Sequence, residues 1–172
     1  MIRELLPEVV REAVASQAGA RSVWLVGGAI RDQFLERTTE DFDFAVERDA
    51  IGLARSVADE LGAYYFTLDA ERDAGRVVPD GDGNGWRRLD FAGLRADSIE
   101  GDLRARDFTV NAMALRIADS EPELIDPTGG VRDVKDRRLR LCASDALERD
   151  PVRALRAVRL AADLEFQLDA SV

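Results

Sequence analysis

Two aspartates, Asp41 and Asp43, stand two residues apart within the apolar segment DFDFAV at residues 41–46. The alternation predicts a buried strand, so both carboxylates lie on one face, about 6.6 Å apart at about 3.3 Å per residue. Aspartate is depleted in strands, and two like charges on one face repel unless a cation lies between them. A divalent cation suits such oxygen ligands. The pattern favours a metal-dependent phosphoryl or nucleotidyl transfer site over two solvated carboxylates on an edge strand.

Composition excludes several classes of protein. The 172 residues are 46% hydrophobic, enough for a core, and include no histidine, which excludes Ser-His-Asp and Cys-His catalysis and histidine-dependent zinc sites. The single cysteine, Cys142, excludes an internal disulfide and favours a reducing compartment. With no membrane-length apolar run and a charged N-terminal segment, a cytoplasmic protein with no membrane partner is expected. The net charge of −10 argues against a generic nucleic-acid binder, although residues 132–159 are locally basic.

Hydrophobic periodicity predicts alternating helices and strands followed by a helical segment. The predicted strands are residues 23–26, 41–46, 63–68, 75–78, 86–91 and 138–142. The predicted helices are a first one from Ile2 that ends before Gly19, then residues 29–35, 50–61, 97–106 and 144–149, and a last helix with Asp150 as its cap. Residues 108–117 are expected to begin as a helix and finish as a strand. The change of pattern predicts one domain over residues 1–141 and the beginning of an all-helical domain over 142–172.

Two further features are compatible with this chemistry but less specific. Gly27 and Gly28 separate a predicted strand from a predicted helix, where bare backbone can approach a phosphate. An ordinary strand-to-helix turn explains the pair at least as well, and neither a P-loop nor a dinucleotide fingerprint is present. Asp90, in the predicted strand WRRLDF, is the best candidate for the third carboxylate that two-metal catalysis needs. A surface aspartate explains its spacing almost equally well.

Charged residues near two turns allow two interpretations each. In DLRARDF, Arg106 and Asp107 suit triphosphate oxygens and a ribose hydroxyl, but they also suit a solvated turn. Near the last helix, Arg149, Arg153 and Arg156 are predicted to share a narrow helix face. Asp150 with Arg153 could present an acceptor and donors to a base edge. Spacing alone favours the simpler interpretation, in which Asp150 caps the helix and the arginines are solvated.

Four blocks in the same order resemble the head and neck of class II tRNA nucleotidyltransferases, the CCA-adding enzymes, and the related bacterial poly(A) polymerases. They are VGGAIRDQFL with DFDFAV, DLRARDFTVNAMAL, IDPTGGVRDVKDRRLRL and DPVRALRAVRLAADLEF, and together they cover most of residues 23–166. The resemblance implies an α+β fold: a polymerase β superfamily nucleotidyltransferase head with a mixed sheet of about five strands flanked by helices. The beginning of a helical neck would follow.

The resemblance also implies roles for individual residues. Asp41 and Asp43 match the metal ligands, and Asp90 stands where the family has an acidic strand residue. Residues matching the nucleotide site are Gly27, Gly28, Arg31 and Asp32 on the triphosphate side, Arg106 and Asp107 at the ribose, and Asp150 and Arg153 at the base, with Arg156 beside them. Three positions depart from the family pattern, namely Ala105, Arg149 and Glu36. Ala105 replaces an arginine, and Arg149 replaces a glutamate next to the base-reading pair.

The implied activity is template-independent addition of CMP and AMP, from CTP and ATP, to an RNA 3′ end, with tRNA as the expected RNA. Two Mg²⁺ ions are the expected cofactors, with Mn²⁺ as the alternative. A poly(A) polymerase, a CC-only or A-only enzyme, and a non-catalytic nucleotide-binding module are the alternatives. Family members continue through body and tail domains that grip tRNA, so RNA is expected to bind mainly through domains absent from this chain.

Overall fold

The structure is a computed structural model that describes residues 5–117, 123–170 and 172. The helices are α2 (Glu8–Ala18), α3 (Gly28–Phe34), α4 (Ala50–Leu61), α5 (Ile99–Arg104), the 3-10 turn η1 (Thr109–Asn111), α6 (Gly130–Lys135), α7 (Ala146–Arg149) and α8 (Val152–Leu164). The strands are β1 (Val23–Val26), β2 (Asp41–Val46), β3 (Tyr64–Asp69), β4 (Ala74–Val78), β5 (Arg88–Gly93), β6 (Ala114–Arg116), β7 (Leu124–Ile125), β8 (Arg138–Leu139) and β9 (Gln167–Leu168).

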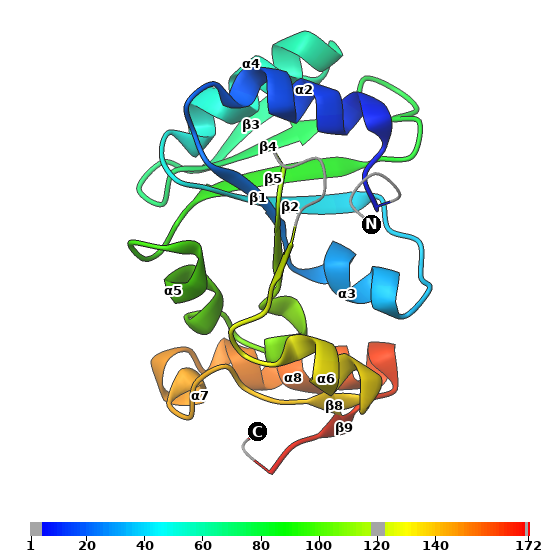
Figure 1. Ribbon diagram of the computed structural model, residues 1–172, viewed down its shortest axis with the longest axis vertical. Coiled ribbons are helices and arrows are strands. Elements are labelled where there is room, and N and C mark those ends of the chain that lie inside the picture. Colours follow the sequence, from blue (N-terminus) through cyan, green and yellow to red (C-terminus); the bar gives the residue numbers. More distant parts are fainter. Residues whose placement is uncertain (1–4, 118–122, 171) are drawn as a thin grey trace.

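A mixed seven-stranded sheet, in the order β3-β4-β5-β2-β1-β6-β7, forms the centre of the fold. All neighbouring pairs are antiparallel except β2 and β5, which run parallel. Helices α2 and α4 cover one face of the sheet (Figure 1). Phe42 and Phe44 of β2 are buried beneath them, and Phe44 stacks on Phe91 of β5 with ring centroids 4.7 Å apart. This face holds most of the hydrophobic core.

The opposite face of the sheet carries the charged residues. Strand residues alternate between faces, so Asp41 and Asp43 emerge opposite Phe42 and Phe44. Parallel pairing places Asp43 beside Asp90, and antiparallel pairing places Asp90 beside Arg76. These charged groups therefore form a row across three strands on the face away from α2 and α4.

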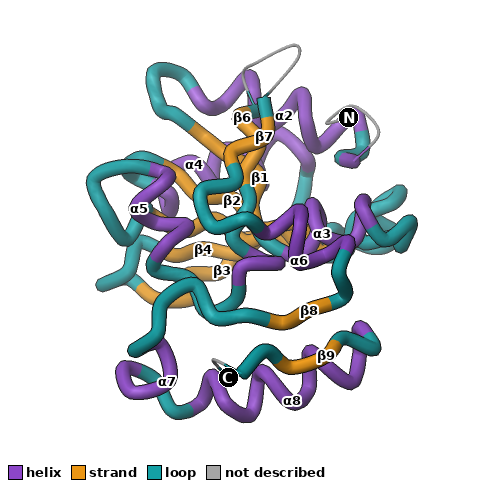
Figure 2. The backbone as a smooth tube through the Cα atoms, turned by 60° about the horizontal axis from the view of Figure 1, so that its bottom comes forward, coloured by secondary structure: helices purple, strands orange, loops and turns teal. Residues whose placement is uncertain are grey.

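A C-terminal layer made of α6, β8, α7, α8 and β9 lies beyond this second face (Figure 2). Ala157 and Leu164 of α8 are buried and belong to the same core cluster as the sheet residues. At the centre of the layer the carboxylate of Asp133 has no solvent exposure and accepts hydrogen bonds from Thr109, Arg138 and Arg140. The layer is thus tied to the sheet by apolar packing and by a buried network of hydrogen bonds.

The predicted α+β class is confirmed, and the bounds of β1, β2 and α4 match their predictions. The sheet has seven strands rather than about five, because β6 and β7 extend one edge. Strand β5 begins at Arg88 rather than Trp86, since Trp86 is buried without joining a strand. Ile2, where the first predicted helix begins, lies outside the described residues.

Two predictions for the C-terminal third are wrong in detail. Residues 138–142 do not form one strand: only β8 is a strand, while Leu141 makes an isolated bridge with Phe108. The segment after residue 142 is not all helical, because β9 pairs in parallel with β8. Both features are short pairings between segments distant in sequence, which local periodicity does not reveal. In the part of the chain that the structure describes, no helix has the length and apolarity that crossing a bilayer requires.

Candidate active site

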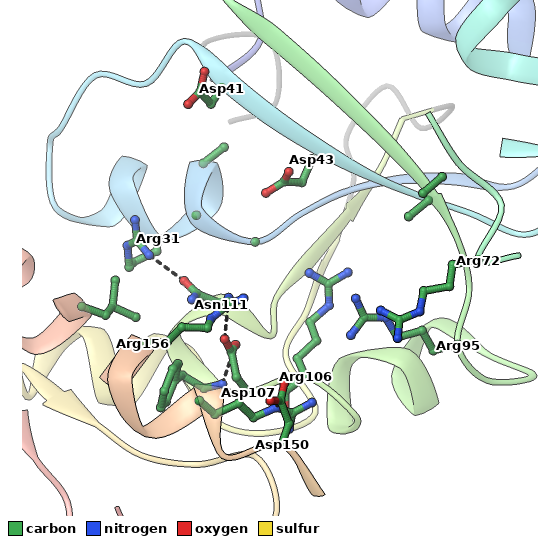
Figure 3. A pocket seen from close by; sticks show the side chains of 18 of the residues that line it. Arg31, Asp41, Asp43, Arg72, Arg95, Arg106, Asp107, Asn111, Asp150 and Arg156 are labelled. Atoms are coloured by element: carbon green, nitrogen blue, oxygen red, sulfur yellow. Dashed lines mark hydrogen bonds and ion pairs between the residues drawn. The ribbon is translucent and has the colours of Figure 1, made fainter. Parts of the chain in front are cut away.

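A large pocket of about 1360 Å³ opens between the charged face of the sheet and α8. Figure 3 shows side chains from the sheet and from the C-terminal layer facing each other across it. The pocket brings together most of the residues predicted from sequence: Gly27, Gly28, Arg31, Asp32, Asp41, Asp43, Arg106, Asp107, Asp150, Arg153 and Arg156. Asp90 is the one predicted site residue that does not line it.

Asp43 points from β2 into the pocket, and it forms no salt bridge with any described residue. Its side chain is open to the pocket's water, yet protein surrounds it on most sides. This loss of hydration, and next the negative charge of Asp90, raise the pKa of the Asp43 carboxyl above its usual value. Asp43 is therefore a carboxylate that would gain from a nearby cation.

Asp41 points to the same face of the sheet but is already engaged. Arg87 donates two hydrogen bonds to its carboxylate, of 3.1 and 2.7 Å, and Arg88 donates one of 3.0 Å. The hydrogen bond from Arg87, together with the positive charges of Arg88 and Arg87, lowers the pKa of Asp41 despite partial burial. A cation binding both Asp41 and Asp43 would have to replace these arginines at Asp41.

Asp90 lies beside Asp43 on the neighbouring strand, which is where a third metal ligand would be expected. Its carboxylate, however, is paired with arginines. Arg76 grips it with hydrogen bonds of 2.7 and 2.8 Å, and Arg88 approaches to 3.5 Å. Within the described residues, no three acidic, cysteine or histidine side chains converge as a ready metal-binding group. The carboxylates of β2 and β5 are thus arranged in a row whose charge is balanced by arginines.

The glycine pair lies against the Asp43 carboxylate. Gly27 has φ of +82°, and a Cβ placed on it would lie 3.2 Å from Asp43 Oδ2. Only glycine adopts this backbone conformation at low cost and leaves room for the carboxylate. Arg31, one turn into α3, is held by Asp32 at 2.8 Å and donates to Asn111 at 2.6 Å. One wall of the pocket therefore contains both the Gly27 turn, which lies against the Asp43 carboxylate, and the Arg31 guanidinium, which is held in place by Asp32 and Asn111.

Arg106 and Asp107 enter the pocket from the turn after α5. Asp102, which is 2% exposed, accepts two hydrogen bonds from Arg106, of 3.1 and 3.0 Å, and fixes its guanidinium. Asp107 accepts from the Phe108 amide at 2.8 Å and pairs with Arg156 of α8 at 2.6 Å. The Asp107–Arg156 pair thus links the two walls of the pocket.

The Asp150 carboxylate accepts from the Val152 amide at 3.1 Å at the start of α8, as the predicted cap should. The accompanying prediction that the arginines are solvated is wrong, because Arg153 is only 14% exposed and Arg156 pairs with Asp107. Arg153 approaches Asp150 at 3.7 Å and donates to the backbone oxygens of Ala105 and Arg106 at 3.4 Å. The prediction that Arg149 shares a helix face with Arg153 is wrong, because Arg149 ends α7 and pairs with Asp145. Asp150 therefore both accepts a hydrogen bond at the start of α8 and lines the pocket.

Cys142 lies next to this site, and its backbone N–H donates to the Asp107 carbonyl oxygen. Burial, and next the negative charge of Asp107, raise the pKa of its thiol to about 12. Since the thiolate is the reactive form, we expect iodoacetamide to alkylate Cys142 at least about a hundredfold more slowly at pH 8 in the folded protein than in urea. Mass spectrometry of timed samples would measure both rates. Equal rates would contradict the raised pKa.

Several residues that line the pocket or hold its side chains in place were not predicted. Asp102 and Asn111 fix Arg106 and Arg31, and both occur within the quoted block DLRARDFTVNAMAL, whose polar residues outside the Arg-Asp pair were the available signal. Arg72 and Arg95 also line the pocket, from the β3–β4 turn and from the segment after β5. Nothing in their local sequence distinguishes them from surface arginines.

Comparisons with known proteins show the family of the chain. Residues 23–97 and 89–140 match the family described as the poly A polymerase head domain. A CC-adding tRNA nucleotidyltransferase of Geobacter sulfurreducens is 39% identical over 166 residues, which are 96% of this chain and 37% of that protein. An A-adding tRNA nucleotidyltransferase of Deinococcus radiodurans is 43% identical over 145 residues, 84% of this chain and 31% of that protein.

A solved structure gives the same result. A tRNA nucleotidyltransferase complexed with a primer tRNA and an incoming ATP analog superposes with a TM-score of 0.77 at 36% identity. The match covers 94% of this chain and 47% of that one. The chain therefore spans about a third of the length of the curated relatives it matches and about half of this solved one.

Proposed function

The chain belongs to the poly(A) polymerase head-domain family, and from that premise we propose that it is the catalytic part of a tRNA nucleotidyltransferase. It would add CMP, AMP or both, from CTP and ATP, to the 3′ end of tRNA. The observation that carries the proposal is Asp43. Its carboxylate, which forms no salt bridge with any described residue, faces a pocket whose other walls hold groups suited to phosphates, a ribose and a base. Two relatives are named as tRNA nucleotidyltransferases, which supports tRNA as the RNA substrate.

The carboxylates of β2 fit a divalent metal, which we propose is Mg²⁺, with Mn²⁺ as the alternative. Asp43 would hold it directly, and Asp41 would do so on exchanging Arg87 and Arg88 for the ion. Asp90 is the candidate third ligand and would likewise have to release Arg76. Two bound ions would supply the Lewis acidity that lowers the pKa of the attacking hydroxyl and offsets charge on the leaving group. Hard oxygen donors are the ligands that such ions prefer.

The residues of the chain would then orient the two substrates. The RNA 3′ oxygen forms a bond to the α-phosphorus of the nucleotide, the bond from that phosphorus to the bridging oxygen breaks, and pyrophosphate leaves; the hydroxyl proton passes to water. We assign Arg31 and Arg106 to the triphosphate, because both guanidiniums are fixed by a neighbouring acceptor. Asp107 would accept from a ribose hydroxyl.

Base selection is assigned to the other wall of the pocket. Asp150 and Arg153 at the start of α8 offer an acceptor and donors, which is what reading the edge of cytosine or adenine requires. Their wall belongs to the C-terminal layer, and we propose that residues 142–172 begin a second domain. Because the relatives extend well beyond the matched region, we propose that most of the tRNA grip lies outside residues 1–172, and we expect these residues alone to bind tRNA weakly.

The test is to incubate the protein with Mg²⁺, CTP, ATP and a tRNA that lacks its CCA end, and to sequence the 3′ ends produced. A finished CCA end, a CC end or an added A on a CC-ended primer would each support the proposal and identify the variant of the activity. Relatives named for CC addition and for A addition both match, so both primers are needed. Homopolymeric A tails would indicate a poly(A) polymerase instead. Tight binding of nucleotide in calorimetry with no incorporation would indicate a non-catalytic module.

A further inference from the structure

Four of the arginines that line the pocket lie in two pairs on either side of Asp43. Figure 3 shows Arg31 and Arg156 on one side, while Arg72 and Arg95 reach from the other side toward Arg106. The pocket, at about 1360 Å³, exceeds the roughly 300–1,000 Å³ that is usual for one small ligand. Its size and its two basic sides leave room for two polyanionic substrates at once.

The two groups differ in how far their charges are already satisfied. Arg31 is paired with Asp32 and bonded to Asn111, and Arg156 is paired with Asp107. Between α3 and α8 these guanidiniums could donate to the phosphates of a nucleotide, and Asp107 could accept from its ribose hydroxyl. Their side of the pocket is therefore the nucleotide side of the proposed reaction.

On the other side the cations are largely uncompensated. Arg95 forms no salt bridge with any described residue; only its backbone N–H is bonded, to Asp102. Arg72 is 81% exposed and approaches its one carboxylate, Asp69, at 3.6 Å. Two of the three acidic residues of this turn are used by backbone amides: Asp69 accepts from the Arg72 amide at 3.1 Å, and Asp73 accepts from the first amides of α4. The third, Glu71, also lines the pocket but forms no salt bridge with any described residue.

Converging guanidiniums repel one another. Among the described residues Asp69, 3.6 Å from Arg72, is the one carboxylate paired with either side chain, so their convergence leaves net positive charge for a bound anion. In phosphoryl transfer the attacking and leaving oxygens lie roughly in line on opposite sides of the phosphorus. If the triphosphate occupies the Arg31 side of Asp43, the attacking 3′ oxygen must arrive from the opposite side. That is the side of Arg72 and Arg95.

We infer that Arg72 and Arg95 form a subsite for the phosphodiester backbone of the RNA strand whose 3′ hydroxyl is extended. The inference deepens the proposed function and rests on it. Arginine forks suit phosphate oxygens, and a single-stranded 3′ end is flexible enough to bring its terminal phosphates to both side chains.

The test compares RNA and nucleotide binding in the double variant Arg72→Gln/Arg95→Gln. The RNA probe is a fluorescein-labelled acceptor-stem minihelix without its CCA end, and the nucleotide probe is ATP. We expect the Kd for RNA to rise about tenfold, and the slope of log K against log salt concentration to fall by about 1.4, because each single-strand phosphate contact contributes about 0.7. The Kd for ATP should stay unchanged.

Arg132→Gln is the matched control. Arg132 is 82% exposed and approaches Asp136 at 3.5 Å, so it resembles Arg72 in exposure and pairing, but it does not line the pocket. Its substitution should alter neither Kd.

Two results would overturn the inference. One is that the double variant and the unmodified protein bind RNA with the same Kd, or that neither binds RNA at all. The other is a rise in the Kd for ATP without a change for RNA, which would place the two arginines on the triphosphate. Failure of the unmodified protein to incorporate CMP or AMP would instead count against the proposed function, and the two binding constants would still decide the inference.

Discussion

Asp43→Asn is expected to reduce incorporation of labelled CMP and AMP by at least about a thousandfold at every Mg²⁺ concentration. A metal contributes several kcal/mol of transition-state stabilisation, and each 1.36 kcal/mol is a factor of ten in rate. Among the described carboxylates of β2 and β5, Asp43 alone forms no salt bridge with an arginine, whereas Asp41 and Asp90 would have to release theirs before binding an ion. Initial rates over a range of Mg²⁺ concentrations would measure the loss.

The stability of the same variant separates a catalytic role from a structural one. Folding raises the pKa of Asp43, so the folded state disfavours its ionised form, and removing the charge should leave the free energy of unfolding unchanged or higher at pH 7. Binding of Mn²⁺, followed by electron paramagnetic resonance, should weaken. Asp59→Asn, at an exposed position of α4, is the control and should change neither property. An Asp43→Asn protein with ordinary turnover would refute the metal site.

Asp133→Ala should have the largest effect on stability. Asp133 is fully buried in α6 and accepts from Thr109 at 2.6 Å, Arg138 at 3.1 Å and Arg140 at 3.0 Å. Removing the carboxylate is expected to cost about 1.5–3 kcal/mol, because the hydrogen bonds to a charged group are lost, while the Arg138 and Arg140 side chains, 40% and 34% exposed, can still reach water. Urea unfolding followed by circular dichroism would measure this loss in the free energy of unfolding.

Asp136→Ala provides the comparison within one helical turn. Asp136 follows α6, is 52% exposed and pairs with Arg132 at the surface, where a pair contributes about 0–1 kcal/mol. Thr109→Val, which removes one hydrogen bond to Asp133, should cost about 1 kcal/mol, or more if the carboxylate is left poorly satisfied. Similar losses for Asp133→Ala and Asp136→Ala would mean that the buried network does not hold the C-terminal layer.

The elements predicted best from the sequence are those whose periodicity is strongest. The bounds of β2 and α4 were predicted correctly because apolar residues alternate in one and recur at helical spacing in the other. The placement of both aspartates on one face of β2 follows from the same alternation. For the residues that the resemblance implied, the structure brings all but Asp90 into one pocket, while their roles stay predictions.

What the sequence could not predict depends on pairing between distant segments. The partners of Asp41 and Asp90 are arginines on β4, on β5 or just before it, and only the register of the sheet brings them together. The pairing of β8 with β9 joins segments about 30 residues apart in sequence. Local propensity contains no information on such contacts.

The alternation of Phe and Asp in β2 has a consequence for misfolding. A slip of one residue in the pairing of this strand would turn Asp41 and Asp43 into the core and Phe42 and Phe44 into water. Such a chain would bury two unpaired charges, so a compact misfolded state with this register would be unstable. The register that buries the two phenylalanines is therefore the one that turns both aspartates toward the pocket, so we expect the folded protein to contain no misregistered fraction.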